Sequence, residues 1–334
     1  MNPPTIYDVA RIAGVSTATV SKVINNTGRI SAKTTEKVTR IMEELNFRPN
    51  MIASAMKGKS TYQIAFLIPD ISNPVYSLYL KHIEERGQER GYNIVLCATD
   101  NRSDKEERHV SILKQRRIDG LIIASKFQNE ELLAQLVREK FPVVLLAHER
   151  PEVEIDSVTV DDYRGGYMAA SHLLSLGHAA IGLIGEDSFS SRERIRGYKQ
   201  AMSEAGIPCD ESLIAVGGPS IAEAELAAAK LLDRDDRPGA IFGCNDLLAI
   251  GVLQAASKRG IEVPRQLSVI GFDDTPLCTI VSPGLTSVSQ PIRELGTEIM
   301  DLLIRKIEQA GLPKQRIRMQ PGISIRETTA RFDG

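Results

Sequence analysis

Short apolar runs alternate with segments of helical periodicity from Tyr62 onward. Runs that are apolar throughout are typical of strands buried on both faces, and a helix between two such strands supplies the crossover that a parallel sheet needs. The alternation therefore predicts a doubly wound α/β fold with parallel sheets. The expected strands are residues 64–68, 93–98, 120–124, 143–147, 157–160, 181–184, 240–243 and 267–272.

The first 60 residues follow a different, helical pattern. Thr5 and Asp8 have the spacing of a capping box, so a first helix is expected from about Ile6. Gly14 permits the left-handed backbone of a tight turn, and Ser16 then caps a second helix. The pattern predicts a helix-turn-helix within a three-helix head. A third amphipathic segment follows residue 31 and closes the core with Val38, Ile41, Met42 and Leu45.

The second expected helix has two unlike faces. Val20, Val23 and Ile24 form one apolar stripe. The opposite face is small and forms hydrogen bonds readily, so it fits a DNA major groove about 12 Å wide. A helical hairpin without a role in DNA binding is the alternative. The residues of the polar face are Thr17, Ala18, Ser21, Lys22 and Asn25.

Charge is divided unevenly along the chain. Residues 1–60 contain nine Lys and Arg against four Asp and Glu, a net charge of +5, whereas the whole chain carries −2, so the remainder carries −7. Neutralisation of phosphates supplies most of the sequence-independent affinity of a protein for DNA. A basic head on an acidic body therefore favours a DNA-binding module joined to a body with another task.

Several spaced motifs carry a family resemblance. They are ATVSKVIN at 18–25, IPDISNP at 68–74, CND at 244–246, GFDD at 271–274 and LTSVSQP at 285–291. With these motifs in this order, the whole chain resembles the LacI/GalR family of bacterial transcriptional regulators. The resemblance implies a helix-turn-helix head, a hinge helix and a two-lobe core similar to a periplasmic binding protein.

The implied domain plan has three parts. The DNA-binding head takes residues 1–48, the hinge helix and linker 49–60, and the effector-binding and dimerisation core 61–334. Three crossings between the lobes of the core make a hinge, through which a bound effector changes operator affinity by about 5- to 150-fold. Lobe 1 comprises residues 61–161 and 291–321, and lobe 2 comprises residues 162–290 and 322–334.

The hinge segment at residues 51–56 spans only about two helical turns, and so short a helix is marginal alone in water. The resemblance implies that it orders on operator DNA beside its twin and inserts an apolar side chain into the minor groove. Met56 holds that position, where Leu is usual; packing of Met56 against the partner helix is the alternative. The expected DNA contacts are Tyr7, Ser16, Thr17, Ala18, Thr19, Ser21, Lys22, Asn25, Asn50, Ala53 and Met56.

Polar side chains follow four of the expected strands. The carboxyl ends of parallel strands meet at one edge of a sheet, so these side chains are expected to share a crevice. Paired donors and acceptors beside an aromatic ring suit a polyhydroxylated ligand. By resemblance, the effector-contacting Arg is Arg194, three residues before Gly197. The same resemblance matches Asn245, Asp273 and Gln290 to sugar-contacting positions, with Asp70, Asn73 and Tyr76 lining the other lobe.

Competing interpretations remain for neighbouring residues. Asp246 and Asp274 are explained at least as well as helix N-caps, and Arg192 and Arg196 as exposed helix residues. Gly-Gly-Pro-Ser at 217–220 stands where relatives often carry an aromatic platform, after a strand that ends near residue 216. The missing platform and the extra arginines leave a sugar, a sugar acid and a sugar phosphate all open as effectors.

Other protein classes lack their signatures in this chain. No G-x-G-x-x-G joins a strand to a helix and no G-x-S-x-G is present, so an enzyme is not expected and no cofactor is implied. No run approaches the ~20 apolar residues of a membrane span, and residues 1–4 do not resemble a signal peptide, so a cytoplasmic protein is expected. The isolated Cys97, Cys209, Cys244 and Cys278 are expected to be buried, without a zinc site or disulfide.

These observations predict a repressor of carbohydrate-utilisation genes that binds a palindromic operator as a homodimer and responds to a sugar or sugar derivative between its lobes. A catabolite-control regulator whose main effector is a phosphorylated carrier protein shares the IYDVA and IPDISN motifs and is the alternative. A stand-alone sugar-binding protein fits the core but not the head. The last residues lack a leucine heptad, which argues against a coiled-coil tetramer.

Overall fold

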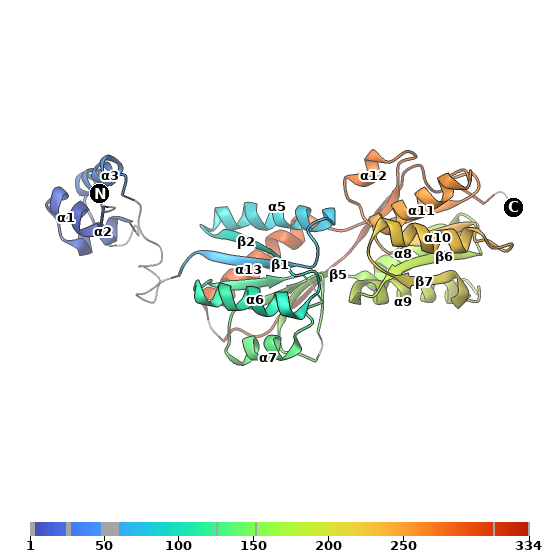
Figure 1. Ribbon diagram of the computed structural model, residues 1–334, viewed down its shortest axis with the longest axis horizontal. Coiled ribbons are helices and arrows are strands. Elements are labelled where there is room, and N and C mark those ends of the chain that lie inside the picture. Colours follow the sequence, from blue (N-terminus) through green and yellow to red (C-terminus); the bar gives the residue numbers. More distant parts are fainter. Residues whose placement is uncertain are drawn as a thin grey trace. The chain divides into compact units, whose positions relative to one another are not determined.

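The structure is a computed structural model that describes residues 4–24, 28–47, 60–124, 126–150, 152–309 and 311–332. Contacts within the chain divide it into two compact units, Met1–Thr61 and Tyr62–Gly334 (Figure 1). No helix among the described residues is both long and apolar enough to cross a membrane.

The first unit contains the predicted three helices. Asp8 Oδ2 accepts hydrogen bonds from the backbone nitrogen (2.9 Å) and hydroxyl (2.7 Å) of Thr5, which fixes the first helix start. Gly14 ends that helix with φ 65°, and Ser16 Oγ accepts from the backbone nitrogen of Thr19 at 3.1 Å to begin the second. Val9, Val20 and further apolar side chains of all three helices meet in one core. The helices are α1 (Ile6–Ala13), α2 (Thr17–Ile24) and α3 (Ala32–Glu44).

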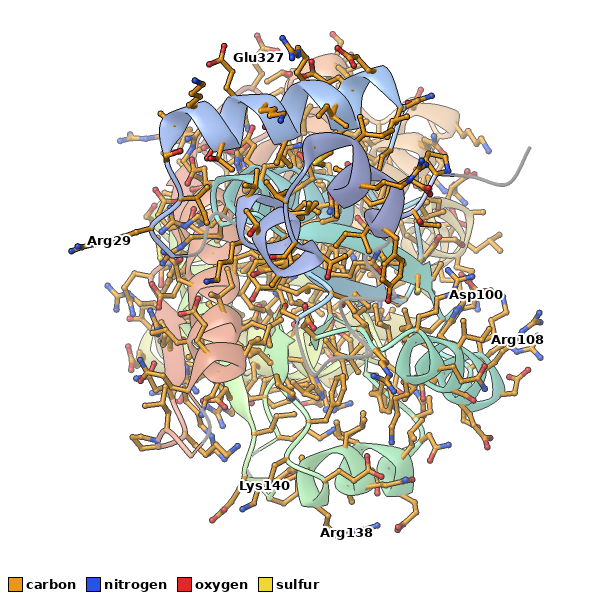
Figure 2. All side chains as sticks on the ribbon, turned by 90° about the vertical axis from the view of Figure 1, so that its left-hand side faces the viewer. Arg29, Asp100, Arg108, Arg138, Lys140 and Glu327 are labelled. Carbon is orange, nitrogen blue, oxygen red and sulfur yellow. The ribbon has the colours of Figure 1, made fainter. Side chains whose placement is uncertain are left out.

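Lobe 1 of the second unit holds a six-stranded parallel sheet in the order β11-β5-β4-β3-β1-β2. Alternate residues of β1 face opposite ways: Phe66 packs in one core with α5 and α13, and Leu67 in another with α6 and α7. Charged side chains such as Arg108 on α6 and Arg138 on α7 point outward (Figure 2). The strands are β1 (Gln63–Ile68), β2 (Asn93–Ala98), β3 (Gly120–Ile123), β4 (Val143–Leu146), β5 (Asp156–Val160) and β11 (Arg316–Met319), and the helices are α5 (Pro74–Glu89), α6 (Ser103–Gln115), α7 (Glu130–Arg138) and α13 (Ile292–Glu308).

Lobe 2 repeats the plan with the order β12-β10-β9-β8-β6-β7, in which β12 is antiparallel to β10 and the other pairs are parallel. A short 3-10 helix, Glu211–Leu213, precedes β7. The strands are β6 (Ile181–Glu186), β7 (Ile214–Gly217), β8 (Ala240–Gly243), β9 (Ser268–Asp273), β10 (Thr286–Ser289) and β12 (Gly322–Ser324), and the helices are α8 (Asp162–Ser175), α9 (Phe189–Glu204), α10 (Ile221–Leu232), α11 (Asp246–Lys258) and α12 (Leu277–Ile280).

The chain passes between the two sheets at Asp161, at residues 290–291 and at residues 320–321. All eight expected strands are present and pair in parallel, each within two residues of its expected ends. Three further strands, β10, β11 and β12, were not expected from the sequence. Of the four cysteines, Cys97, Cys244 and Cys278 are buried as expected, whereas Cys209 is only half-buried, which corrects that expectation.

Candidate functional site

A cavity of about 300 Å³ lies between the lobes, where the parallel strands of both sheets end. Strand ends meet there because every strand that precedes a helix in a doubly wound sheet runs in the same direction. All seven residues expected at an effector site line this one cavity. They are Asp70, Asn73 and Tyr76 from lobe 1, Arg194, Asn245 and Asp273 from lobe 2, and Gln290 at a crossing.

Arg194 is held by groups of lobe 2. Its Nε donates to Asp162 Oδ1 at 2.7 Å, and its Nη1 donates to the carbonyl oxygen of Cys244 and lies 3.7 Å from Asp273 Oδ1. The guanidinium carbon lies 3.4 Å from the ring centroid of Phe272, close enough for a cation–π contact. The side chain is therefore buried, oriented and charge-compensated before any ligand arrives.

Close approach of α8 and α9 makes this arrangement possible. A Cβ atom on Gly197 would lie 1.9 Å from the carbonyl oxygen of Tyr163, and one on Gly166 would lie 2.0 Å from that of Arg194. Only glycine fits at both positions, so the Gly that follows Arg194 by three residues serves helix packing. The R-x-x-G spacing thus has a structural cause that sequence reasoning did not supply.

A chain of hydrogen bonds leads from Asp273 to lobe 1. Asp273 Oδ1 accepts from Gln290 Nε2 at 2.6 Å, and Gln290 Oε1 accepts from the Tyr79 hydroxyl at 2.6 Å. Asp273 has a strained backbone, with φ 112°. Burial raises the pKa of its carboxyl group to about 8, although the positive charge of Arg194 opposes the rise. This chain of hydrogen bonds connects β9, the second crossing between the lobes at residues 290–291, and α5.

Two asparagines of the cavity cap helices. Asn73 Oδ1 accepts from the backbone nitrogen of Val75 at 3.1 Å, and Asn245 Oδ1 accepts from that of Leu248 at 2.8 Å. Each cap uses the amide oxygen, which leaves the amide N–H groups as donors. Asp70 is exposed, and its two oxygens accept from the backbone nitrogen and hydroxyl of Ser72 at 2.8 and 2.6 Å.

Asp246 and Asp274 have neither of the roles proposed for them from sequence. Asp246 is buried and accepts from the backbone nitrogen of Thr275 at 2.7 Å and the Ser287 hydroxyl at 2.7 Å, while Asn245 is the N-cap. Asp274 forms an ion pair with Arg326 at 2.6 Å. Neither aspartate is among the residues that line the cavity.

The interpretation of Arg192 and Arg196 as exposed helix residues is supported. Arg192 and Arg196 are exposed and pair with Asp187 and Glu193, at 3.0 and 2.9 Å.

Lys126, His148 and Phe189, which join the lobes across the cavity, were not expected there from the sequence. Lys126 Nζ of lobe 1 lies 3.3 Å from Asp187 Oδ2 of lobe 2, and the His148 and Phe189 rings meet edge to face with centroids 5.4 Å apart. Burial lowers the pKa of His148 to about 4, and its Nε2 has no hydrogen-bond partner. Their only signal in the sequence is a position just after a strand. The remaining newly found lining residues include Tyr79, Asn101, Gln128 and Glu186.

Gly217 and Pro219 of the Gly-Gly-Pro-Ser segment also line the cavity. The segment provides no aromatic ring, as its sequence requires, but Phe189 at the start of α9 lines the same cavity.

The polar face of α2 lies open in the head. Ser16, Ala18 and Lys22 are exposed and Thr17, Thr19 and Ser21 are half-buried, whereas Val20 on the other face is fully buried. Tyr7 on α1 is 73% exposed, which is unusual for so large an apolar ring. Of the expected DNA contacts, Asn25, Asn50, Ala53 and Met56 lie outside the described residues.

Two protein families match parts of the chain. Residues 5–50 match the bacterial regulatory proteins of the lacI family, and residues 170–329 match the periplasmic binding protein-like domain. The chain is 46% identical to the HTH-type transcriptional regulator DegA of Bacillus subtilis, over 98% of each protein. It is 36% identical to catabolite control protein A of Priestia megaterium, over 97% of this chain and 99% of that protein.

Solved structures agree with these similarities. The lac repressor dimer bound to operator and the anti-inducer ONPF is 28% identical with a TM-score of 0.86, over 98% of this chain and all of that one. A LacI family transcriptional regulator of Enterococcus faecium with bound ribose is 30% identical with a TM-score of 0.74, over 81% of this chain and all of that one. The likeness to the lac repressor covers the head as well as the core.

Proposed function

The chain belongs to the LacI family and is a DNA-binding transcriptional regulator rather than an enzyme, and we propose that it is a dimeric repressor of carbohydrate-utilisation genes. In this proposal a sugar or sugar derivative binds in the cavity between the lobes and changes the affinity for operator DNA. The observation that carries the proposal is the gathering of the seven expected effector residues around one cavity.

The groups of the cavity suit a polyhydroxylated ligand. Asn73 and Asn245 offer amide donors, Asp70 and Asp273 offer acceptors, and Tyr76 offers a ring face. The E. faecium relative was solved with ribose, which supports a carbohydrate as the ligand class.

The bonds across the cavity supply a route for coupling. A ligand that forms hydrogen bonds with Asp273 or Gln290 competes with the hydrogen bonds that connect Asp273 through Gln290 to Tyr79 on α5. It would therefore favour one arrangement of the lobes over another, which is the requirement for an allosteric effect.

The proposed DNA contacts are the exposed face of α2 with Tyr7, together with the hinge residues Asn50, Ala53 and Met56. One three-helix head reads a half-site, so two copies related by a two-fold axis match a palindromic operator. The solved lac repressor is a dimer on its operator, which supports this assembly.

A second candidate is a regulator of the catabolite-control kind, whose main effector is a phosphorylated carrier protein. The identity of 36% with catabolite control protein A favours it. It differs from the first candidate in predicting operator binding that no small sugar relieves.

The test is a titration of the full chain against a fluorescent palindromic duplex from upstream of its own gene, at fixed salt, with and without a pool of sugars, sugar acids and sugar phosphates. Tight binding relieved by the pool supports the sugar-responsive repressor. Tight binding unaffected by the pool supports the second candidate, and absence of binding in both conditions argues against a repressor of this operator.

A further inference from the structure

Carboxylates outnumber cations around the cavity between the lobes. Asp70, Glu186 and Asp187 line it as carboxylates, against Lys126 and Arg194, while Asp273, whose pKa burial raises to about 8, keeps its proton at pH 7. Burial keeps His148 uncharged near neutral pH because it lowers the pKa of the ring to about 4, so this side chain adds no positive charge. An empty cavity of this composition carries an excess of negative charge.

Both cations of the cavity are already compensated. Arg194 lies between Asp162 at 2.7 Å and Asp273 at 3.7 Å, and Lys126 lies 3.3 Å from Asp187. A phosphate or carboxylate on the ligand would have to displace one of these partners and would then face the other carboxylates. The geometry therefore disfavours a sugar acid or a sugar phosphate.

Glu186 is a partly buried carboxylate of the cavity whose side chain is hydrogen-bonded to Ser188 but has no cation as a partner in the part of the chain that the structure describes. It ends β6, is half-buried, and forms no ion pair within 4.0 Å among the described residues. Burial raises the pKa of its carboxyl group, and the field of Arg194 opposes the rise. A carboxylate held near an aromatic ring without a cation of its own is a receptor for a cationic ligand.

Tyr76 supplies that ring. Burial raises the pKa of its hydroxyl group, and the negative charges of Glu186, Asp273 and Asp70 raise it further. Tyr76 and these three acidic residues line the same cavity. An aromatic ring among carboxylates binds an ammonium group through both ion pairing and cation–π contact.

We propose that the effector is a sugar-like polyol that carries a protonated amine, and that this amine binds beside Glu186 and the ring of Tyr76. The inference rests on the proposed function and narrows its ligand class. His148 Nε2, buried in the cavity wall without a partner, is a further polar group that an incoming ligand can engage when the His148–Phe189 contact shifts.

The test uses matched ligands on the full chain. For glucose, galactose and mannose, the neutral sugar is compared with its 2-amino derivative, the N-acetylated form of that amine and the corresponding aldonic acid. Binding is measured by calorimetry at pH 7 and one ionic strength, and operator release by fluorescence anisotropy. At least one amine should bind tenfold or more tightly than its neutral and N-acetylated partners, and the acids should not bind.

Glu186→Gln tests the assigned position. The variant should lose at least tenfold in affinity for the amine and keep the weaker affinity for the neutral sugar. Glu193→Gln is the matched control, because Glu193 lies on the neighbouring α9 and pairs with Arg196 outside the cavity. Thermal melting checks that both variants fold, and Glu186→Asp, which keeps the charge, should retain the preference for the amine.

The outcomes separate this inference from the proposed function. Release of operator by a neutral sugar or an acid, with no advantage for the amine, contradicts the inference of an amine-bearing effector. It still supports the proposed sugar-responsive repressor. Amine binding that does not change operator affinity overturns the proposed function alone. Operator binding that no ligand of the set relieves overturns both.

Discussion

The head and the cavity hold their polar side chains in opposite ways. In the head, Ser16 Oγ bonds to the backbone of Thr19 three residues away, and Lys22 is exposed. In the cavity, Tyr79 donates to Gln290, 211 residues away. Local bonds leave the outer face of α2 available to a partner from solvent, whereas a ligand of the cavity must compete with bonds that connect the lobes. DNA binding and effector binding should therefore respond to different mutations, and the cavity mutations should also affect stability.

The largest expected effect is that of Arg194→Ala on the core. The change leaves Asp162 and Asp273 buried without their cation, and loss of one partner of a buried ion pair lowers the free energy of unfolding by about 3–5 kcal/mol. Urea unfolding followed by circular dichroism measures it. The operator affinity of the folded fraction should not change.

Arg192→Ala is the control for that variant. Arg192 pairs with Asp187 at 3.0 Å on the surface, where the two side chains are 54% and 72% exposed, so its loss should lower the free energy of unfolding by at most about 1 kcal/mol. Equal effects of the two substitutions would show that Arg194 is not a buried structural cation. That result would contradict the expectation that mutations in the cavity, unlike those in the head, also affect stability.

Asp273→Asn should change the pH dependence of core stability. Burial raises the pKa of Asp273 to about 8, with Arg194, Asp246 and Asp162 as its charged neighbours. Between the unfolded pKa near 3.9 and pH 8, the unfolded chain releases this proton while the folded chain keeps it, so the free energy of unfolding falls as pH rises. The side chain of the Asn variant does not titrate, so this fall in the free energy of unfolding is absent from it.

The measurement for Asp273→Asn is a urea-unfolding series from pH 5 to pH 9. Relative to the unmodified chain, the variant should gain stability with rising pH, on the order of 1 kcal/mol per pH unit up to about pH 8 and little above it. A difference that is constant with pH, or that shrinks as pH rises, contradicts the prediction. Effector binding should weaken at every pH.

Lys22→Ala should act on the head alone. Loss of one contact to a phosphate or base edge weakens operator binding by about tenfold, or about 1.4 kcal/mol. Anisotropy titrations at fixed salt measure the loss. Lys199→Ala removes the same charge from the core, where Lys199 pairs with Glu211 at 2.6 Å, and should leave operator affinity unchanged. A change in effector affinity in the Lys22 variant would contradict the separation of the two sites.

The same contrast explains how much the sequence could predict. Local periodicity and caps determine the three helices of the head and the eight apolar strands. Each strand was predicted to within two residues at both ends, and the first two helices were predicted to start at their capping residues. Strand direction places Asn245 and Asp273 at one edge of the sheet, and the family resemblance distinguished Arg194 from the neighbouring arginines.

What could not be predicted depends on contacts between distant residues. β10 has a polar sequence, and it is buried because Ser287 bonds to Asp246 and the backbone of Thr286 bonds to Thr328. No local pattern reveals such partners. The same holds for Glu186 and His148, which look like ordinary loop residues until both lobes are in place.

The smallest expected effect tests whether the long-range chain of bonds transmits the effector signal. Tyr79→Phe keeps the buried ring and removes only the hydroxyl that bonds to Gln290, so the free energy of unfolding should fall by about 1 kcal/mol. The ratio of operator affinities without and with effector should also fall, by less than tenfold. Tyr198→Phe is the matched control, because Tyr198 is equally buried and its hydroxyl donates to the Ile181 carbonyl oxygen at 2.7 Å within lobe 2. The control should lose similar stability and keep the full ratio. If both variants reduce the ratio equally, loss of stability explains the effect, and the bond between Tyr79 and Gln290 does not carry the coupling between lobes.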